Sequence, residues 1–172
     1  MFMYQKNREQ KERLETLFKR VNAVYGTLPP QMEFLGNIDA EYLEDFLKML
    51  LRMVKHPNIH ADIFAFIRLH IAFKEEYAYC KAYNTKFLLA KEYTQEQLNA
   101  VVKEVTALPL DAKHQALANH AVRAIYESKK VVRGDFEKLY EMGWSQKDVF
   151  DAIEHGATLL KNGRILTTYS EK

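Results

Sequence analysis

The sequence predicts an all-α protein of about seven or eight helices. Three observations support this fold class. Apolar residues recur at i, i+3, i+4 and i+7 along most of the chain, which is the spacing of one helical face. Capping residues, or Pro and Gly, separate these segments. No alternation of apolar and polar residues competes with the helical pattern as a strand.

Four helices are predicted in the first half of the chain. They are expected at residues 8–25, 39–55, 59–73 and 76–91. Gly26 and the Pro29-Pro30 pair end the first helix. Asp39 and Asn58 are the expected N-caps of the second and third helices. The third helix is apolar on more than one face, which predicts a central position buried on both sides. The fourth follows it with almost no break.

Four more helices are predicted in the second half. They are expected at residues 94–106, 111–129, 134–142 and 145–161, with Thr94, Asp111 and Ser145 as capping residues. Thr94 and Gln97 have the spacing of a capping box. Gly143 is the expected stop of the third of these helices, and Asn162-Gly163 the expected end of the last.

Length and composition limit the function classes. The 172 residues favour one domain, residues 1–172, and 48% apolar with 28% charged residues is typical of a globular protein. The net charge of +2 comes from charges spread along the chain, so we expect neither a nucleic-acid surface nor a membrane surface. No apolar run approaches a membrane span, and the N-terminal residues lack a signal core. A lone cysteine excludes an intrachain disulfide. Together these features predict a cytoplasmic protein.

The lone cysteine, Cys80, is the candidate reactive group. Its place early in a helix exposes the thiol to the positive end of the helix dipole, and Lys81 acts in the same direction, so both favour thiolate. Glu75 and Glu76 oppose them, because negative charge raises a thiol pKa. From residue type alone, a single cysteine in an apolar helical protein is most often a small buried hydrophobe.

Several segments together resemble one family. They are Arg68 and Ala72 with Tyr77-Ala-Tyr79-Cys80-Lys-Ala-Tyr83-Asn84, then Thr94-Gln-Glu-Gln, Asp111-Ala-Lys-His-Gln-Ala-Leu, and Glu141-Met-Gly-Trp144-Ser-Gln-Lys-Asp-Val-Phe. This pattern is similar to the alkylhydroperoxidase D-like / carboxymuconolactone decarboxylase superfamily, in its peroxidase-related branch. The resemblance covers about residues 15–165, although no single motif is intact. It implies an alkylhydroperoxidase D-like helical bundle.

The resemblance also implies which site groups are missing. The family's peroxide-attacking cysteine falls on Cys80, its other cysteine on Tyr77, its histidine on Asn84 and its glutamate on Ala65. Tyrosine cannot form a disulfide, asparagine does not titrate and alanine cannot accept a proton. Turnover with two cysteines is therefore excluded. A one-cysteine cycle, in which an external thiol reduces an oxidised Cys80, stays open.

Nearby side chains are candidate replacements for the missing groups. Glu76 and Asn84 lie four residues before and after Cys80, which would place all three on one helical face. Tyr77, Tyr79 and Tyr83 offer hydroxyl groups, and His70 lies one helix back. Each has a simpler structural explanation: a solvated acid for Glu76, half-buried packing for the tyrosines and a hydrogen-bonded histidine for His70.

We expect neither a metal nor a cofactor. His56 and His60 have the i, i+4 spacing of a helical metal site, but Pro57 and Asn58 between them should break the helix. No glycine-rich phosphate loop, nucleophile elbow or zinc-binding helix motif occurs in the sequence.

Two functions follow as expectations, and whether the chain is an enzyme stays open. The first is a diverged alkylhydroperoxidase D-like protein with a residual antioxidant or thiol role through Cys80. The alternative is a non-enzymatic protein that keeps the fold to bind a partner or a small ligand, either apolar or a peroxide. The resemblance implies a homo-oligomer, a trimer or a hexamer. Apolar residues consistent with a subunit interface are Phe2, Met3, Tyr4, Phe34 and Tyr169.

Overall fold

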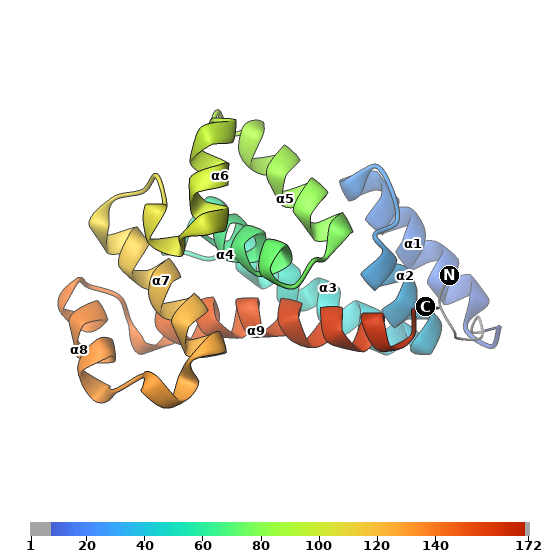
Figure 1. Cartoon of the computed structure of the whole chain (residues 1–172). Helices are drawn as coiled ribbons and strands as arrows, with labels where there is room; N and C mark the ends of the chain where they lie inside the picture. The colour runs from blue at the N-terminus through green and yellow to red at the C-terminus, as the bar shows by residue number, and fades with distance from the viewer. Residues whose placement is uncertain (1–7, 171–172) are drawn as a thin grey trace. The chain divides into compact units, whose positions relative to one another are not determined.

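The computed structural model describes residues 8–170, most of which lie in helices (Figure 1). Over these residues there are nine α-helices, two short 3₁₀ helices and no β-strand. The all-α prediction is therefore confirmed, with one helix more than expected. The helices are α1 (Lys11–Tyr25), α2 (Pro30–Ile38), α3 (Ala40–Val54), α4 (Ala61–Lys74), α5 (Ala78–Leu89), α6 (Gln95–Lys103), α7 (Ala112–Tyr126), α8 (Arg133–Glu141) and α9 (Gln146–Thr168).

The additional helix, α2, begins at one of the prolines that were expected only to stop α1. Pro30 occupies the first position of α2, where its fixed φ suits a helix and its missing N–H is not needed. Gly26 does end α1, in the left-handed conformation at φ 70°. Asp39 caps α3 as predicted, because its Oδ1 accepts the Glu41 N–H at 2.7 Å.

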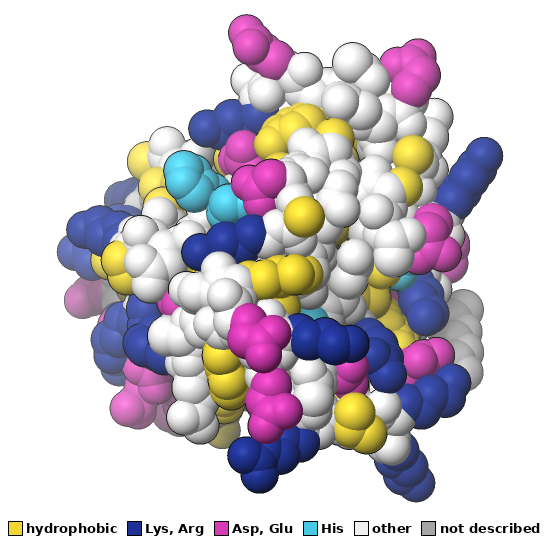
Figure 2. Space-filling view, turned by 90° about the vertical axis from the view of Figure 1, so that its left-hand side faces the viewer, with side chains coloured by type: hydrophobic (Ala, Val, Ile, Leu, Met, Phe, Trp, Pro, Cys, Tyr) yellow, Lys and Arg dark blue, Asp and Glu magenta, His cyan; other side chains and the backbone are white. Residues whose placement is uncertain are grey.

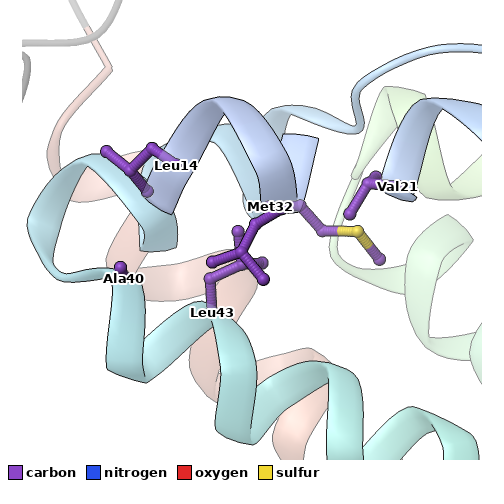
Figure 3. Packing of buried hydrophobic residues seen from close by; sticks show 6 residues of the cluster. Leu14, Val21, Met32, Ala40 and Leu43 are labelled. Atoms are coloured by element: carbon purple, nitrogen blue, oxygen red, sulfur yellow. The ribbon is translucent and has the colours of Figure 1, made fainter. Parts of the chain in front are cut away.

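The described residues form two compact units, one of residues 8–52 with 161–170 and the other of residues 53–160. The prediction of a single domain stays a prediction. The core of the first unit joins α1, α2 and α3 through the buried side chains of Leu14, Leu17, Val21, Met32, Ala40 and Leu43. Figure 3 shows Met32 lying between Leu43 and Val21. Val24, near the end of α1, is 78% exposed.

In the second unit, α4 is the central helix, as its sequence predicted. It packs against α5, α6 and α7 (Figure 1). Its buried residues are Ile63, Phe64, Ala65, Phe66, Ile67, Leu69, Ile71 and Ala72. The predicted start of this helix was wrong, since α4 begins at Ala61 and Asn58 does not cap it. The Asn58 side chain instead donates to the Asp148 carboxylate at 3.1 Å.

Most predicted caps of the later helices are confirmed. Thr94 and Gln97 form the capping box of α6, and Asp111 accepts the His114 N–H at the start of α7. Gly143 follows α8 at φ 86°. The predicted end of α9 was wrong: the helix continues through Asn162-Gly163 to Thr168. A glycine within a helix costs only about 1 kcal/mol, and burial of the neighbouring Asn162 favours continuation.

No helix of the described residues is both long and apolar enough to cross a bilayer. Figure 2 shows a face on which Lys and Arg side chains lie interspersed with Asp and Glu. Apolar side chains appear there in small groups between the charges. This face therefore carries no extended field of one sign.

A substitution at Gly156 of α9 tests the close packing around α4. A Cβ added there would lie 2.5 Å from Ile125 Cδ1 and 3.0 Å from atoms of both Ile67 and Ile71. Gly156→Ala should therefore lower the free energy of unfolding by about 1–3 kcal/mol, because the packed isoleucines must move. The matched control is Gly134→Ala in α8, where nothing lies within 4 Å of the added methyl group. Urea unfolding should show the loss for the first variant only; equal stability of both would contradict this packing.

Candidate functional site

The lone cysteine lies in the first turn of α5. α4 ends at Lys74, a short turn follows, and Tyr77 is the N-cap residue of α5, so Cys80 is its third helical residue. The turn depends on Glu76, which adopts the left-handed conformation at φ 60° although it is not glycine. Cys80 is half-buried and free.

The predicted helical face of Glu76, Cys80 and Asn84 is only partly formed. Glu76 precedes α5, so it lacks the helical i, i+4 relation to Cys80. Its carboxylate is 81% exposed and forms an ion pair with Lys81. Lys81 and Glu76, which were expected to shift the pKa of Cys80 in opposite directions, therefore pair with each other. Neither acts as a base on the thiol.

Burial determines the state of the thiol. Desolvation raises the pKa of Cys80, and the positive charge of Arg68 offsets part of that effect. The net result is a pKa above the usual value for a thiol, so Cys80 is protonated at neutral pH. The helix dipole and Lys81, which the sequence suggested, do not produce a thiolate here.

Asn84 is buried with both ends of its amide engaged. Its Nδ2 donates to the backbone carbonyl of Cys80 at 2.8 Å, and its Oδ1 accepts from Arg68 Nε at 2.8 Å. The resemblance assigns this position to a titrating histidine. Here the side chain instead connects the first turn of α5 to α4, and it contacts the backbone of Cys80 rather than the sulfur.

Arg68 and His155 complete the polar cluster. Arg68 Nη1 lies 2.8 Å from His155 Nε2, so α9 joins α4 and α5 in one network. Ala65, where the resemblance would place a glutamate, is fully buried one turn before Arg68 on the same helix. The polar group that α4 contributes is therefore a cation in place of an acid.

The hydrogen bonds fix the protonation of His155. Arginine has only donors, so His155 Nε2 must accept and the ring proton must lie on Nδ1. Burial, together with the Arg68 charge, holds the pKa of His155 well below its usual range, so the ring is neutral. Its Nδ1 is buried without a hydrogen-bond partner among the described residues. The His155 ring also packs on Phe64, with the ring centroids 4.6 Å apart.

The three tyrosines surround Cys80 as packing groups. The Tyr77 hydroxyl donates to the Leu160 carbonyl at 3.3 Å. Tyr79 and Tyr83 stack with ring centroids 6.1 Å apart. Burial, with the neighbouring Tyr83 and Cys80, raises the pKa of Tyr79, so its phenol stays protonated. The Tyr79 phenol therefore cannot serve as a base at neutral pH.

His70 lies away from the cysteine. Its Nδ1 is 3.0 Å from the Val101 carbonyl, which ties α4 to α6. His70 lies two positions after Arg68, so the two side chains leave α4 in nearly opposite directions. Because Arg68 faces Asn84 of α5, His70 faces a different neighbour. This geometry agrees with the simpler explanation of His70, a hydrogen-bonded structural histidine.

Two residues of this cluster were not recognised from the sequence. In the sequence, Arg68 is notable only as part of the family pattern, and no motif marks His155. Arg68 is the only Arg or Lys between residues 59 and 73, a mostly apolar stretch, which is a recognisable signal. His155 falls on the apolar face of α9 defined by Val149, Ala152 and Leu159. A polar residue on such a face is a candidate for a buried hydrogen-bonding group.

A second titratable cluster lies where the segment before α4 meets the start of α9. His56 Nε2 is 3.1 Å from the Asp151 carboxylate and 3.7 Å from that of Asp148, with all three side chains buried. His56 Nδ1 accepts the Ile59 N–H at 2.9 Å, so the proton on Nε2 points to the carboxylates. His56 is therefore a structural link. His60 is exposed with its ring near His114. His56 and His60 lie between α3 and α4 and not on one helix, as the intervening Pro57 and Asn58 predicted.

Ser145 caps α9 as predicted, because its hydroxyl oxygen accepts the Asp148 N–H at 3.1 Å. The Asp148 carboxylate in turn accepts the Ser145 N–H at 2.9 Å and the Ser145 hydroxyl at 2.7 Å. Asp151 pairs with Lys147. Within residues 8–170 no group of three or more His, Cys, Asp or Glu side chains is placed to hold a metal ion.

Acidification should weaken this link. Burial tends to raise the pKa of Asp148, but hydrogen bonds from Ser145 and Asn58 and the nearby His56 lower it overall. Its stabilising contribution is therefore complete above the unfolded-state pKa of about 4 and is lost as the pH falls through the lower folded-state value. Asp148→Asn should lower the free energy of unfolding by about 1–2 kcal/mol at pH 7. The deficit should shrink below about pH 4.

Urea unfolding between pH 7 and pH 2 measures this difference. Asp45→Asn is the matched control, because Asp45 lies in an exposed pair with Lys48 and should change stability by under about 0.5 kcal/mol. A deficit for Asp148→Asn that stays constant down to pH 2 would contradict the role of its charge.

Comparison with known proteins identifies the fold. An uncharacterized peroxidase-related protein from Silicibacter sp. TM1040 has a similar structure, with a TM-score of 0.79, 15% identity, and coverage of 99% of this chain and 87% of its own. The alkylhydroperoxidase AhpD core of an uncharacterized peroxidase-related protein from Ralstonia eutropha JMP134 gives a TM-score of 0.78 at 16% identity, covering 99% of this chain and 92% of its own. No family model matches the sequence, and no curated protein matches it either. The chain therefore has the predicted alkylhydroperoxidase D-like fold.

Proposed function

We propose that this chain is a diverged alkylhydroperoxidase D-like protein without two-cysteine peroxidase turnover, in which Cys80 keeps a slow, one-cysteine thiol chemistry. The observation that carries the proposal is the state of Cys80: a half-buried thiol whose pKa is raised by burial, with no titrating base at Asn84. A cytoplasmic location fits this proposal, because a reducing compartment keeps a lone thiol reduced.

The chemistry of the site limits the reaction to one sulfur. The thiolate would attack one peroxide oxygen and break the O–O bond. The sulfur is then oxidised to sulfenic acid, and the peroxide leaves as water or an alcohol after taking up a proton. No second cysteine can condense with the sulfenic acid, so an external thiol must reduce it by two electrons. This is the antioxidant role that the proposal assigns.

The neighbouring groups make the first step slow. Glu76 is paired with Lys81, Asn84 cannot titrate and His70 is bonded to Val101. None of these three groups therefore removes the thiol proton, and thiolate formation depends on solution pH.

Thiol reactivity tests the proposal directly. Alkylation of Cys80 by iodoacetamide should follow a pH profile with a midpoint above about 8.5, because burial disfavours the thiolate. Its second-order rate with hydrogen peroxide at pH 7 should not exceed that of free cysteine. Cys80→Ser removes the only thiol and is the control in both assays. A midpoint below about 7, or a peroxide rate far above free cysteine, would show an activated thiol and reject the proposal.

The second candidate function is binding without catalysis, in a homo-oligomer that is a trimer or a hexamer. Large apolar side chains on the described surface favour it, among them Leu51 at 53%, Val54 at 71% and Phe150 at 63% exposure. Of two described residues expected at the interface, Phe34 is buried within the chain, whereas Tyr169 is 37% exposed. Their rings pack together with centroids 5.0 Å apart. Phe2, Met3 and Tyr4 lie outside the described residues. In this function the fold would bind a small apolar ligand or a partner.

The mass in solution tests the assembly. Light scattering coupled to gel filtration should give three or six times the chain mass of 20.2 kDa, because exposed apolar area favours association. Phe150→Asp should lower that mass if its ring lies in the interface, whereas Lys11→Asp at the exposed start of α1 is the surface control. A stable monomer at micromolar concentration would rule out the oligomer and leave the thiol proposal standing.

A further inference from the structure

Arg68 is the charged group that the structure brings to Cys80. Its Nε donates to Asn84 Oδ1 and its Nη1 donates to His155 Nε2, both at 2.8 Å. Both acceptors are neutral, since an amide does not titrate and His155 carries a single ring proton. Arginine itself stays charged at all relevant pH values. These two bonds therefore hold the guanidinium at a fixed place between α5 and α9.

The same hydrogen bonds connect Arg68 to the turn that carries the thiol. Asn84 Nδ2 donates to the Cys80 carbonyl at 2.8 Å, so one amide joins the guanidinium to the backbone of Cys80. On the other side, His155 is buried against Phe64 and cannot move easily. The charge and the first turn of α5 are held as one rigid arrangement across three helices.

The other charged and titratable groups near the thiol do not provide this charge. Lys81 is paired with Glu76, the Tyr79 phenol is protonated and the His155 ring is neutral. We propose that Arg68 is the positioning residue of Cys80: it fixes the first turn of α5 through Asn84 and presents its positive charge to the sulfur. The role rests on the proposed function, in which Cys80 is the reactive group.

Removal of the Arg68 charge should make the Cys80 thiolate harder to form. Opposite charge within a few ångströms favours the charged form of a group, and burial strengthens the effect. The direction agrees with the action of Arg68 on the pKa of Cys80, which it lowers against the effect of burial. Without the guanidinium, the alkylation midpoint should rise by about 0.5–1.5 pH units, and the alkylation rate at pH 7 should fall about 3- to 30-fold.

The experiment compares pH profiles of iodoacetamide alkylation for a set of variants of the full chain. Arg68→Met removes the charge and both hydrogen bonds, whereas Arg68→Lys keeps the charge and should restore most of the difference. Arg133→Met, at an exposed position of α8, is the matched control and should leave the profile unchanged. Circular dichroism verifies that each variant is helical. Alkylation in urea should give one midpoint for all variants, because the unfolded thiol has lost its neighbours.

The outcomes separate this inference from the proposed function. A raised midpoint in Arg68→Met, restored in Arg68→Lys, supports the role of Arg68. A folded Arg68→Met with the wild-type midpoint overturns it, even where the wild-type thiol is as slow as proposed. Should Arg68→Met not fold, Arg68→Gln decides: its side-chain amide keeps a hydrogen-bond donor in place of the charge, so a raised midpoint supports the inference and a midpoint that is not raised overturns it.

Discussion

The arrangement of the site depends on the buried position of α4. A helix enclosed by α5, α6 and α7 can carry a charged side chain only if its donors find acceptors nearby. Arg68 meets this requirement through Asn84 on one side and His155 on the other. A guanidinium in such a setting costs several kcal/mol if one partner is removed. The site is therefore organised by the need to satisfy one buried cation.

This constraint explains how the site differs from the family it resembles. A proton relay needs groups that change their charge near neutral pH. Arg68 never loses its proton, and the network holds His155 in one tautomer with its Nε2 as acceptor. The hydrogen bonds near Cys80 are thus suited to hold the helices and a charge in place, and poorly suited to move protons.

Much of the fold could be predicted from local patterns, because caps and apolar periodicity act within a few residues. Thr94 and Asp111 were located correctly for this reason. The helix α2 and the length of α9 were not, because prolines can start a helix as well as stop one and packing can carry a helix through glycine. The place of Cys80 early in a helix was also predicted from the sequence. The Arg68–His155 pair did not, since 87 positions separate its members and only tertiary packing brings them together.

The free thiol has one more consequence, for the local dynamics of the chain. The sequence contains a single cysteine, and this residue is half-buried. A thiol-specific label therefore attaches only at Cys80, in the first turn of α5. Its labelling rate depends on how often that turn separates from α4, in the way that amide exchange depends on local opening. The labelling rate of Cys80 is thus a measure of local opening at the start of α5.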